Sequence, residues 1–117
     1  MYMKKVLILG AAGNIGTYLV DYFYDRKEEY GLELITADLS SNKFIEEHSK
    51  FYKFDIRERD TFEALPENIY AVIDLATTMP ARMLGFHPES YVSTNIDGTV
   101  NVLEFCREKN IDRLLFA

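Results

Sequence analysis

Short runs of apolar residues alternate along the chain with longer segments in which apolar residues recur at helical spacing. The runs show little alternation with polar residues, as is typical of buried parallel strands, and they predict strands at residues 4–9, 32–37, 51–54, 69–75 and 113–117. The segments between them predict helices at residues 14–27, 40–47, 57–66 and 88–109. Because strands that alternate with helices form parallel sheets with right-handed crossovers, we expect an α/β, Rossmann-like, doubly wound sheet of strand order 3-2-1-4-5 that ends after its fifth strand.

Three glycines at three-residue spacing separate the first predicted strand from the first predicted helix. Gly10 lets the chain turn off the strand, Gly13 lets backbone lie against a pyrophosphate, and Gly16 lets the helix pack close to the strand. Asn14 and Ile15 open the helix, whose N-terminus directs N–H groups and a positive dipole end toward the same place. In this context the spacing predicts a dinucleotide-binding loop, although glycines also occur in plain tight turns.

An acidic residue ends the second predicted strand, 22 residues after Gly16. The carboxylate of Asp38 can accept hydrogen bonds from both hydroxyls of an adenosine ribose, and it would repel the 2′-phosphate of NADP. This position therefore favours NAD as the cofactor. The alternative interpretation is that Asp38 caps the short helix predicted at residues 40–47.

Composition narrows the class of protein. A chain of 117 residues that is 48% hydrophobic is long and apolar enough for one domain with a core, and its net charge of −6 makes nucleic acid an unexpected partner. Cys106 is the only cysteine, and its apolar neighbours predict a buried structural thiol. No apolar stretch approaches the ~20 residues of a membrane span, so we expect no membrane partner and a cytoplasmic location.

Five short motifs follow one another in an order typical of one family. They are the glycine loop at residues 10–16, the acidic turn at 38–41, the Asp-Ile pair at 55–56, the Leu-Ala strand end at 75–76, and the segment 87–104, which contains Asn-Ile-Asp-Gly-Thr-Val-Asn-Val-Leu. With these motifs the chain resembles the N-terminal half of the extended short-chain dehydrogenase/reductases, the NAD-dependent epimerase/dehydratase family. Residues 1–117 would then be a single NAD-binding Rossmann domain that is incomplete relative to the family.

The resemblance implies that NAD is the cofactor and that the rim at the carboxyl ends of the strands holds it. The implied cofactor-binding residues are Gly10, Gly13, Asn14, Ile15, Gly16, Asp38, Leu39, Asp55, Ile56, Leu75, Ala76, Thr77 and Asn95. In the family, the Asp-hydrophobic pair holds the adenine, and the asparagine that matches Asn95 supports the active site near the nicotinamide. The loop at residues 76–80 is expected to lie on the same rim as the glycine loop.

The family's catalytic residues follow the fifth strand: a Ser or Thr, and a Tyr-x-x-x-Lys pair that supplies the acid and base. None of the eight tyrosines here has a lysine four residues further on. We therefore expect this chain alone to bind NAD without catalysis, as part of an oxidoreductase that acts on nucleotide sugars or similar hydroxyl or keto substrates. Two alternatives are a stand-alone NAD-binding sensor or regulatory module, and one half of a two-chain enzyme.

Other features of the sequence suggest partners or allow more than one interpretation. The predicted last strand presents an apolar edge that could pair with a partner strand or with a missing C-terminal half, and the family uses the helix matching residues 88–109 for homodimers. Its apolar stripe, Val92-Ile96-Val100-Leu103, is expected first to pack on the sheet and second to serve as that interface. Gly98 suits either close packing or a nearby cofactor. Asp74, where the family often has His or Asn, would repel a pyrophosphate if it faced the rim and would be harmless if it faced a helix N-terminus.

Overall fold

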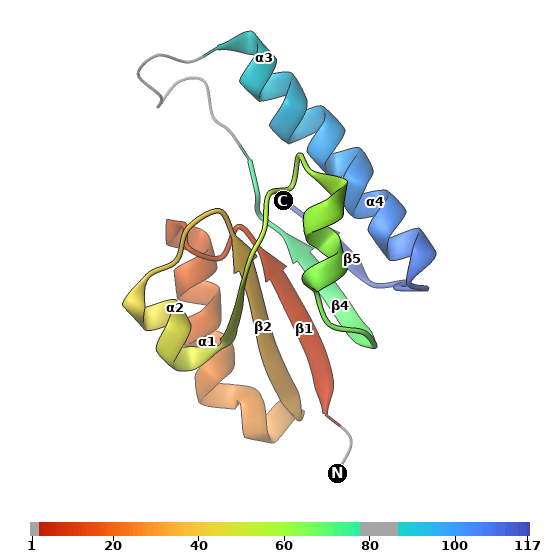
Figure 1. Cartoon of the computed structure of the whole chain (residues 1–117). Helices are drawn as coiled ribbons and strands as arrows, with labels where there is room; N and C mark the ends of the chain where they lie inside the picture. The colour runs from red at the N-terminus through yellow and green to blue at the C-terminus, as the bar shows by residue number, and fades with distance from the viewer. Residues whose placement is uncertain (1–2, 78–86) are drawn as a thin grey trace.

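The computed structural model of the chain describes residues 3–77 and 87–117 and contains a five-stranded sheet (Figure 1). The strands are β1 Lys4–Leu9, β2 Leu32–Asp38, β3 Lys50–Lys53, β4 Ile69–Asp74 and β5 Leu114–Phe116. They lie in the order β3-β2-β1-β4-β5, and every neighbouring pair is parallel. The predicted fold class and strand order are therefore confirmed.

The helices connect these strands as crossovers. They are α1 Asn14–Tyr30, α2 Lys43–His48, the 3₁₀ helix η1 Arg59–Ala64, and α3 Pro88–Tyr91, η3 Val92–Asp97 and α4 Gly98–Glu108. The last three follow one another without a break as one long helix, in which η3 has π-helical hydrogen bonding. The glycine after α1 adopts a left-handed conformation and ends the helix, as the sequence predicts, because its N–H reaches back to a carbonyl of the last turn.

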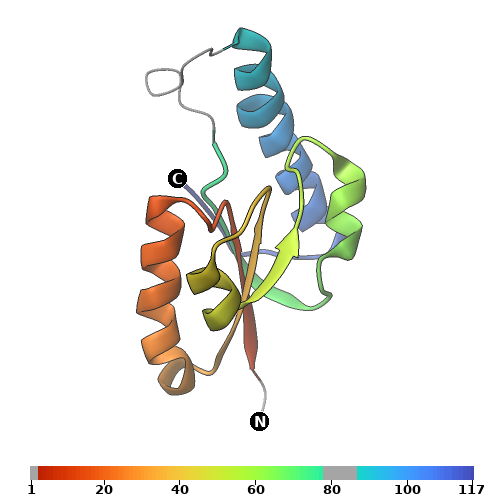
Figure 2. The ribbon, with the colours of Figure 1, turned by 60° about the vertical axis from the view of Figure 1, so that its left-hand side comes forward.

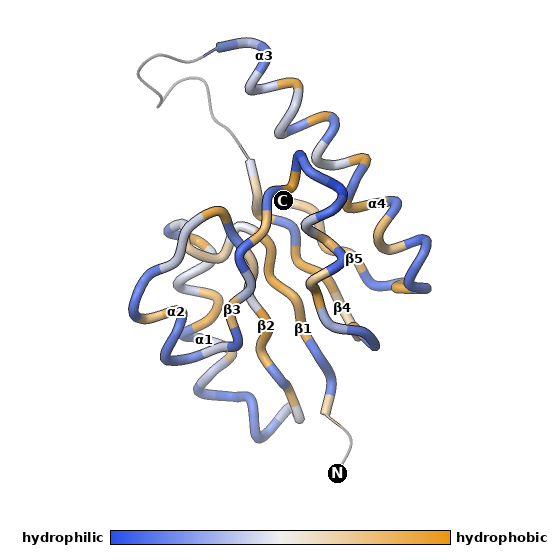
Figure 3. The backbone as a smooth tube through the Cα atoms, viewed as in Figure 1, coloured by the Kyte–Doolittle hydropathy of each residue, from blue (hydrophilic) through white to orange (hydrophobic). Residues whose placement is uncertain are grey.

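Helices cover the sheet on both faces, which makes it doubly wound (Figure 2). On one face α1 and α2 pack against the side chains of Val6 and Ile8, and on the other η1 and α4 pack against those of Leu7 and Leu9. Successive residues of a strand point to opposite faces, so the continuous apolar run of β1 supplies both cores. The tube in Figure 3 is accordingly most hydrophobic along the central strands.

The inward face of α1 differs in part from the one that helical spacing predicts, which consists of Ile15, Leu19, Tyr22 and Phe23. Leu19 and Phe23 pack against the core as expected, whereas Ile15 and Tyr22 are 66% and 48% exposed. The fully buried residues of the helix are Gly16 and Val20. The glycine sets the rotation of the helix because a Cβ at residue 16 would lie 2.5 Å from the backbone of Ala11. This close approach turns the apolar side chains on either side of it partly outward.

The long helix is also rotated relative to the prediction. Its sheet-facing residues are Gly98, Asn101, Val102, Phe105 and Cys106. The stripe predicted to pack on the sheet is instead about half exposed along its whole length, so that prediction is wrong. The helix rotates in this way because Gly98, which has no side chain, admits the loop after β3. None of the described helices combines the length and the apolar character that crossing a bilayer requires.

Candidate functional site

The predicted site residues lie together at one edge of the sheet. The segments after β1, β2, β3 and β4 leave their strands at the carboxyl edge, and η3 extends beyond the same edge (Figures 1 and 2). In doubly wound folds, this edge is where ligands bind, close to the point at which the strand order reverses. Here that point lies between β1 and β4, directly beside the glycine loop.

Two of the three loop glycines are required by contacts within the chain. Gly10 has a φ of +78°, and a Cβ there would lie 2.7 Å from the amide nitrogen of Ala76. Its own N–H donates to the carbonyl of Ala37 over 2.8 Å. Gly16 meets the backbone of Ala11 in the same way. These glycines hold the loop against β2, against the end of β4 and against its own helix.

The middle glycine has no such internal reason. Gly13 has an extended conformation that any residue can adopt, with φ −74° and ψ 178°, and a Cβ there would meet only the carbonyl oxygen of Gly10 at 3.6 Å. It is the N-cap of α1, and no side chain caps the helix at this end. Asn14 and Ile15 follow in the first turn. Residue 13 thus leaves space in front of the N-terminus of α1, a helix of 17 residues. A phosphate group fits best at such a place.

Asp38 connects the end of β2 to this loop. One carboxylate oxygen accepts a hydrogen bond from the N–H of Ala12 over 2.9 Å, and the other accepts one from the N–H of Leu39 over 2.6 Å. The alternative role of Asp38 as a helix cap is wrong, because the side chain of Asn42 caps α2 and accepts from the N–H of Ile45. The carboxylate is therefore fixed beside the glycine loop. The sequence alone shows how many residues separate Asp38 from this loop, but not that the two are in contact.

The two residues of the Asp-Ile pair after β3 contact different neighbours. The carboxylate of Asp55 accepts two hydrogen bonds from the guanidinium of Arg57, at 2.9 and 2.7 Å, and this pairing lowers the pKa of Asp55. Ile56 is buried, packs against Gly98 and accepts a hydrogen bond at its carbonyl from the side chain of Asn101 over 2.9 Å. Gly98 is therefore a packing glycine within the described structure. Its nearest neighbour is the loop after β3.

Two of these partners were not identified from the sequence. Asn101 is a buried polar residue on the sheet-facing side of α4, and a single polar position within that buried stripe is the signal that could have revealed it. Arg57 gave no comparable signal, because an arginine two residues after an aspartate is ordinary on a surface.

The end of β4 joins the glycine loop to the long helix. The N–H of Leu75 donates to the carbonyl of Leu9 over 2.9 Å, and the backbone of Ala76 lies against Gly10. The hydroxyl of Thr77 then donates to the side-chain oxygen of Asn95 over 3.1 Å. Residues 78–80 of the predicted rim loop lie outside the described residues. Asn95 belongs to the π-helical η3, and π-helical turns are frequent at functional sites.

Asp74 occupies neither of the places that the sequence suggests for it. It is 1% exposed, and one carboxylate oxygen accepts a hydrogen bond from the N–H of Ala76 over 3.1 Å. The other oxygen has no hydrogen-bond partner among the described residues. Burial raises the pKa of Asp74 to about 6. The thiol of Cys106 is buried as predicted, and its pKa is raised by burial and by the charge of Asp74.

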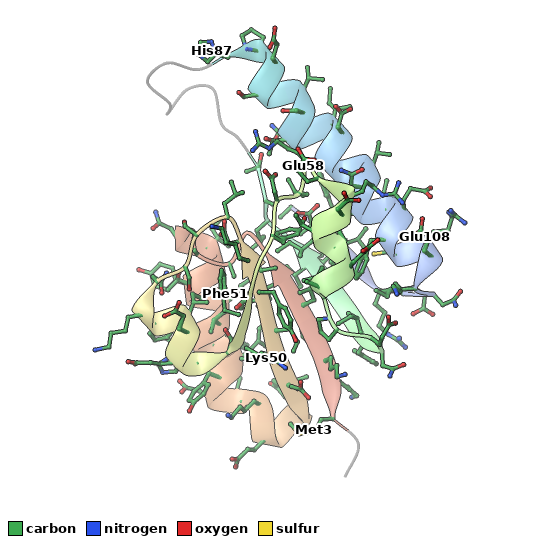
Figure 4. All side chains as sticks on the ribbon, in the orientation of Figure 1. Met3, Lys50, Phe51, Glu58, His87 and Glu108 are labelled. Atoms are coloured by element: carbon green, nitrogen blue, oxygen red, sulfur yellow. The ribbon has the colours of Figure 1, made fainter. Side chains whose placement is uncertain are left out.

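A hollow of about 690 Å³ lies at the opposite, amino edge of the sheet. The side chains that line it include those of Tyr24, Leu32 and His48, together with Met3, which marks this edge in Figure 4. The predicted site residues, all of which the structure describes, do not contribute to it. Because the strand ends and the helix N-terminus favour ligands at the carboxyl edge, we place the candidate site there.

Comparison with known protein families identifies where this arrangement recurs. Residues 6–117 match the model of the NAD dependent epimerase/dehydratase family. A putative UDP-glucose 4-epimerase from Methanocaldococcus jannaschii is 30% identical over 114 residues, which make up 96% of this chain and 37% of that protein. The chain thus spans little more than a third of the length of this relative.

Solved structures share the fold. A monomeric L-threonine 3-dehydrogenase from a metagenome, solved in its apo form, is 35% identical with a TM-score of 0.76, over 93% of this chain and 34% of its own. The UDP-glucose 4-epimerase of Thermus thermophilus, solved in complex with NAD, is 24% identical with a TM-score of 0.77, over 94% of this chain and 36% of its own. The sheet described above is therefore the fold that these structures share, and the Thermus thermophilus epimerase was solved with NAD bound to it.

Proposed function

Because this chain belongs to the NAD dependent epimerase/dehydratase family as its N-terminal Rossmann portion, we propose that it binds NAD along the carboxyl edge of its sheet. The proposal rests above all on Gly13. Two loop glycines are explained by backbone contacts within the chain, whereas Gly13 is not, and the space it leaves adjoins the N-terminus of α1. The pyrophosphate of NAD fits that space and gains the helix N–H groups as donors.

Asp38 supports the assignment of the adenosine end. Its carboxylate is fixed against Ala12 and ends β2 beside the loop, so a ribose placed there would offer its hydroxyls to a charged acceptor. A 2′-phosphate would place negative charge against this carboxylate, which favours NAD over NADP. The exposed side chain of Leu39 and the backbone of Ile56 would border the adenine, with Asp55 held in place by Arg57.

Leu75, Ala76, Thr77 and Asn95 would border the nicotinamide half. They line the path from the glycine loop to η3, and the hydrogen bond from Thr77 fixes the side-chain oxygen of Asn95 toward that path. When bound, NAD supplies a hydride acceptor for oxidation of a substrate hydroxyl. The residues of this chain would bind and orient the cofactor in that reaction.

For the whole protein we propose an oxidoreductase that acts on nucleotide sugars or similar hydroxyl or keto substrates. Its substrate-orienting Ser or Thr and its Tyr-x-x-x-Lys pair are not among these 117 residues, so this chain alone would bind NAD without turnover. A stand-alone NAD-binding sensor and one half of a two-chain enzyme are the alternatives. Catalysis after addition of a second polypeptide would select the two-chain enzyme.

Two exposed apolar surfaces suit the partners expected for such a protein. The outward stripe of the long helix, Val92-Ile96-Val100-Leu103, would pair with the same stripe of a second copy. The free edge of β5, with Leu115 and Phe116 exposed, would accept a further strand from the rest of the fold.

Calorimetric titration of the purified chain with NAD and with NADP tests the proposal. We expect saturable binding of NAD and weaker binding of NADP, because only NADP brings a 2′-phosphate to Asp38. The variant Gly13→Val should abolish NAD binding while the circular dichroism spectrum of the native fold remains. Equal binding of NAD by this variant would exclude the pyrophosphate from residue 13.

A further inference from the structure

The buried carboxyl at the end of β4 is placed next to the proposed cofactor site without forming part of its surface. Asp74 pairs in register with Leu9 on β1 and with Phe116 on β5, so it lies one residue before the level of Gly10. Adjacent strands are about 4.8 Å apart. Its side chain points to the same face of the sheet as that of Leu9, toward α4, and is buried there close to the start of the glycine loop.

This carboxyl also shapes the segment that contacts the loop. It accepts the N–H of Ala76, two residues further on, and so bends the chain out of β4 in an Asx turn. The backbone of Ala76 is the surface against which Gly10 packs. The protonation state of Asp74 is thus coupled by one hydrogen bond to the wall of the proposed site.

Among the residues that the structure describes, few charged or titratable groups lie near Asp74. Its neighbours on β1 and β5 are apolar, and of the described residues on α4, only the thiol of Cys106 interacts with its charge. The second carboxylate oxygen has no donor among the described residues, so an ionised Asp74 leaves an unpaired charge in a buried place. Burial accordingly raises the pKa of this carboxyl to about 6, which allows it to titrate close to neutral pH.

We propose that Asp74 takes up a proton when NAD binds, so that pH sets the affinity of the site for its cofactor. This proposal rests on the proposed function, because the pyrophosphate of NAD would bring negative charge to the glycine loop, where Gly10 packs against the same Ala76 backbone that Asp74 binds. A like charge in a poorly solvated place favours the neutral acid. By linkage, NAD then binds more tightly as the pH falls through the range in which Asp74 becomes protonated.

Calorimetry of NAD binding in two buffers of different ionisation enthalpy measures this proton directly on the wild-type chain. We expect a fractional uptake of up to one proton per NAD, with a maximum between pH 6 and 7. The affinity should be roughly tenfold higher at pH 5 than at pH 8, since each tenfold change corresponds to a shift of one unit in the pKa. The variant Asp74→Asn, which keeps the shape of the side chain, should bind NAD with no proton uptake and a flat pH profile.

A matched control and an independent readout separate the outcomes. Asp112→Asn makes the same chemical change at an aspartate whose side chain is 84% exposed on the opposite edge, and it should keep the wild-type pH profile. The amide signal of Ala76 should titrate near pH 6 in the free wild-type chain by nuclear magnetic resonance. NAD binding without proton uptake would overturn the coupling alone. Titration of Ala76 without NAD binding at any pH would overturn the proposed function and the coupling with it.

Discussion

The two halves of the sheet differ in how fully contacts within the chain explain why each residue type is present. In the first half, β1, α1 and β2 pack around a loop in which Gly10 and Gly16 touch backbone and Asp38 holds an amide. In the second half, the long helix is covered on one side only. There β5 is an edge strand, and an apolar stripe of the helix is about half exposed.

In each half, the residues that internal contacts do not explain are the candidates for function. Where internal contacts explain nearly everything, the exception is informative, and in the first half that exception is Gly13. In the second half the unexplained features are larger: an apolar helix face, an unpaired strand edge and a buried carboxylate oxygen of Asp74. The open space at Gly13 in the first half therefore fits the proposed binding of a small ligand. The exposed apolar surfaces of the second half fit the proposed protein partners, and its buried carboxyl fits the proposed uptake of a proton.

Valine at two of the loop glycines should break the first half in two different ways. Gly16→Val should lower the free energy of unfolding by about 3 kcal/mol, because its Cβ would meet the backbone of Ala11, which cannot move aside cheaply. Gly13→Val should cost about 1 kcal/mol or less, because its site is open and only N-cap preference is lost. Urea unfolding measures both. Equal losses would mean that the two glycines do not differ in role.

The pH dependence of stability should sharpen the picture of the second half. Because the pKa of Asp74 is raised from 3.8 to about 6 in the folded state, the folded chain binds this proton more tightly than the unfolded chain. The stabilisation is fully present below pH 3.8 and is lost as the pH rises to about 6, a change of roughly 3 kcal/mol. Comparing the unfolding of wild type and Asp74→Asn across this range isolates the effect. Parallel pH profiles would contradict it.

Removal of the Asp38 carboxylate should weaken the ligand site of the first half without unfolding it. We expect Asp38→Ala to reduce NAD affinity by roughly 1.5–3 kcal/mol, the usual contribution of a hydrogen bond to a charged group. It should also narrow the preference for NAD over NADP. Asp21→Ala, an exposed position on α1, is the control and should bind like the wild type. Unchanged NAD affinity in Asp38→Ala would exclude the ribose from this carboxylate.

Two valines on α4 offer the smallest and most direct comparison. Val102 is 1% exposed and Val100 is 52% exposed, although they lie two residues apart on the same helix. Val102→Ala should cost about 2 kcal/mol of unfolding free energy, whereas Val100→Ala should cost less than about 0.5 kcal/mol in a monomer. A larger, concentration-dependent loss at Val100 in thermal unfolding would show that the stripe is covered by a second copy.

Much of the fold was determined by the sequence alone. Runs such as that of β1 are apolar without alternation, which selects buried parallel strands, and the intervening helices then fix the strand order through right-handed crossovers. The role of Gly10 was also predictable from the local sequence. A chain that must turn sharply between a strand and a helix requires a residue with positive φ.

Only the tertiary structure decided how these elements face one another. The rotations of α1 and of the long helix follow from close contacts of Gly16 with the backbone of Ala11 and of Gly98 with the side chain of Ile56. The hydropathy pattern along one helix does not contain those contacts. The hydrogen bond from Asn101 to the carbonyl of Ile56 and the burial of Asp74 likewise depend on which surfaces meet. Local pattern sets which segments form strands and helices, whereas the chemistry of a side chain is set by neighbours that only folding brings together.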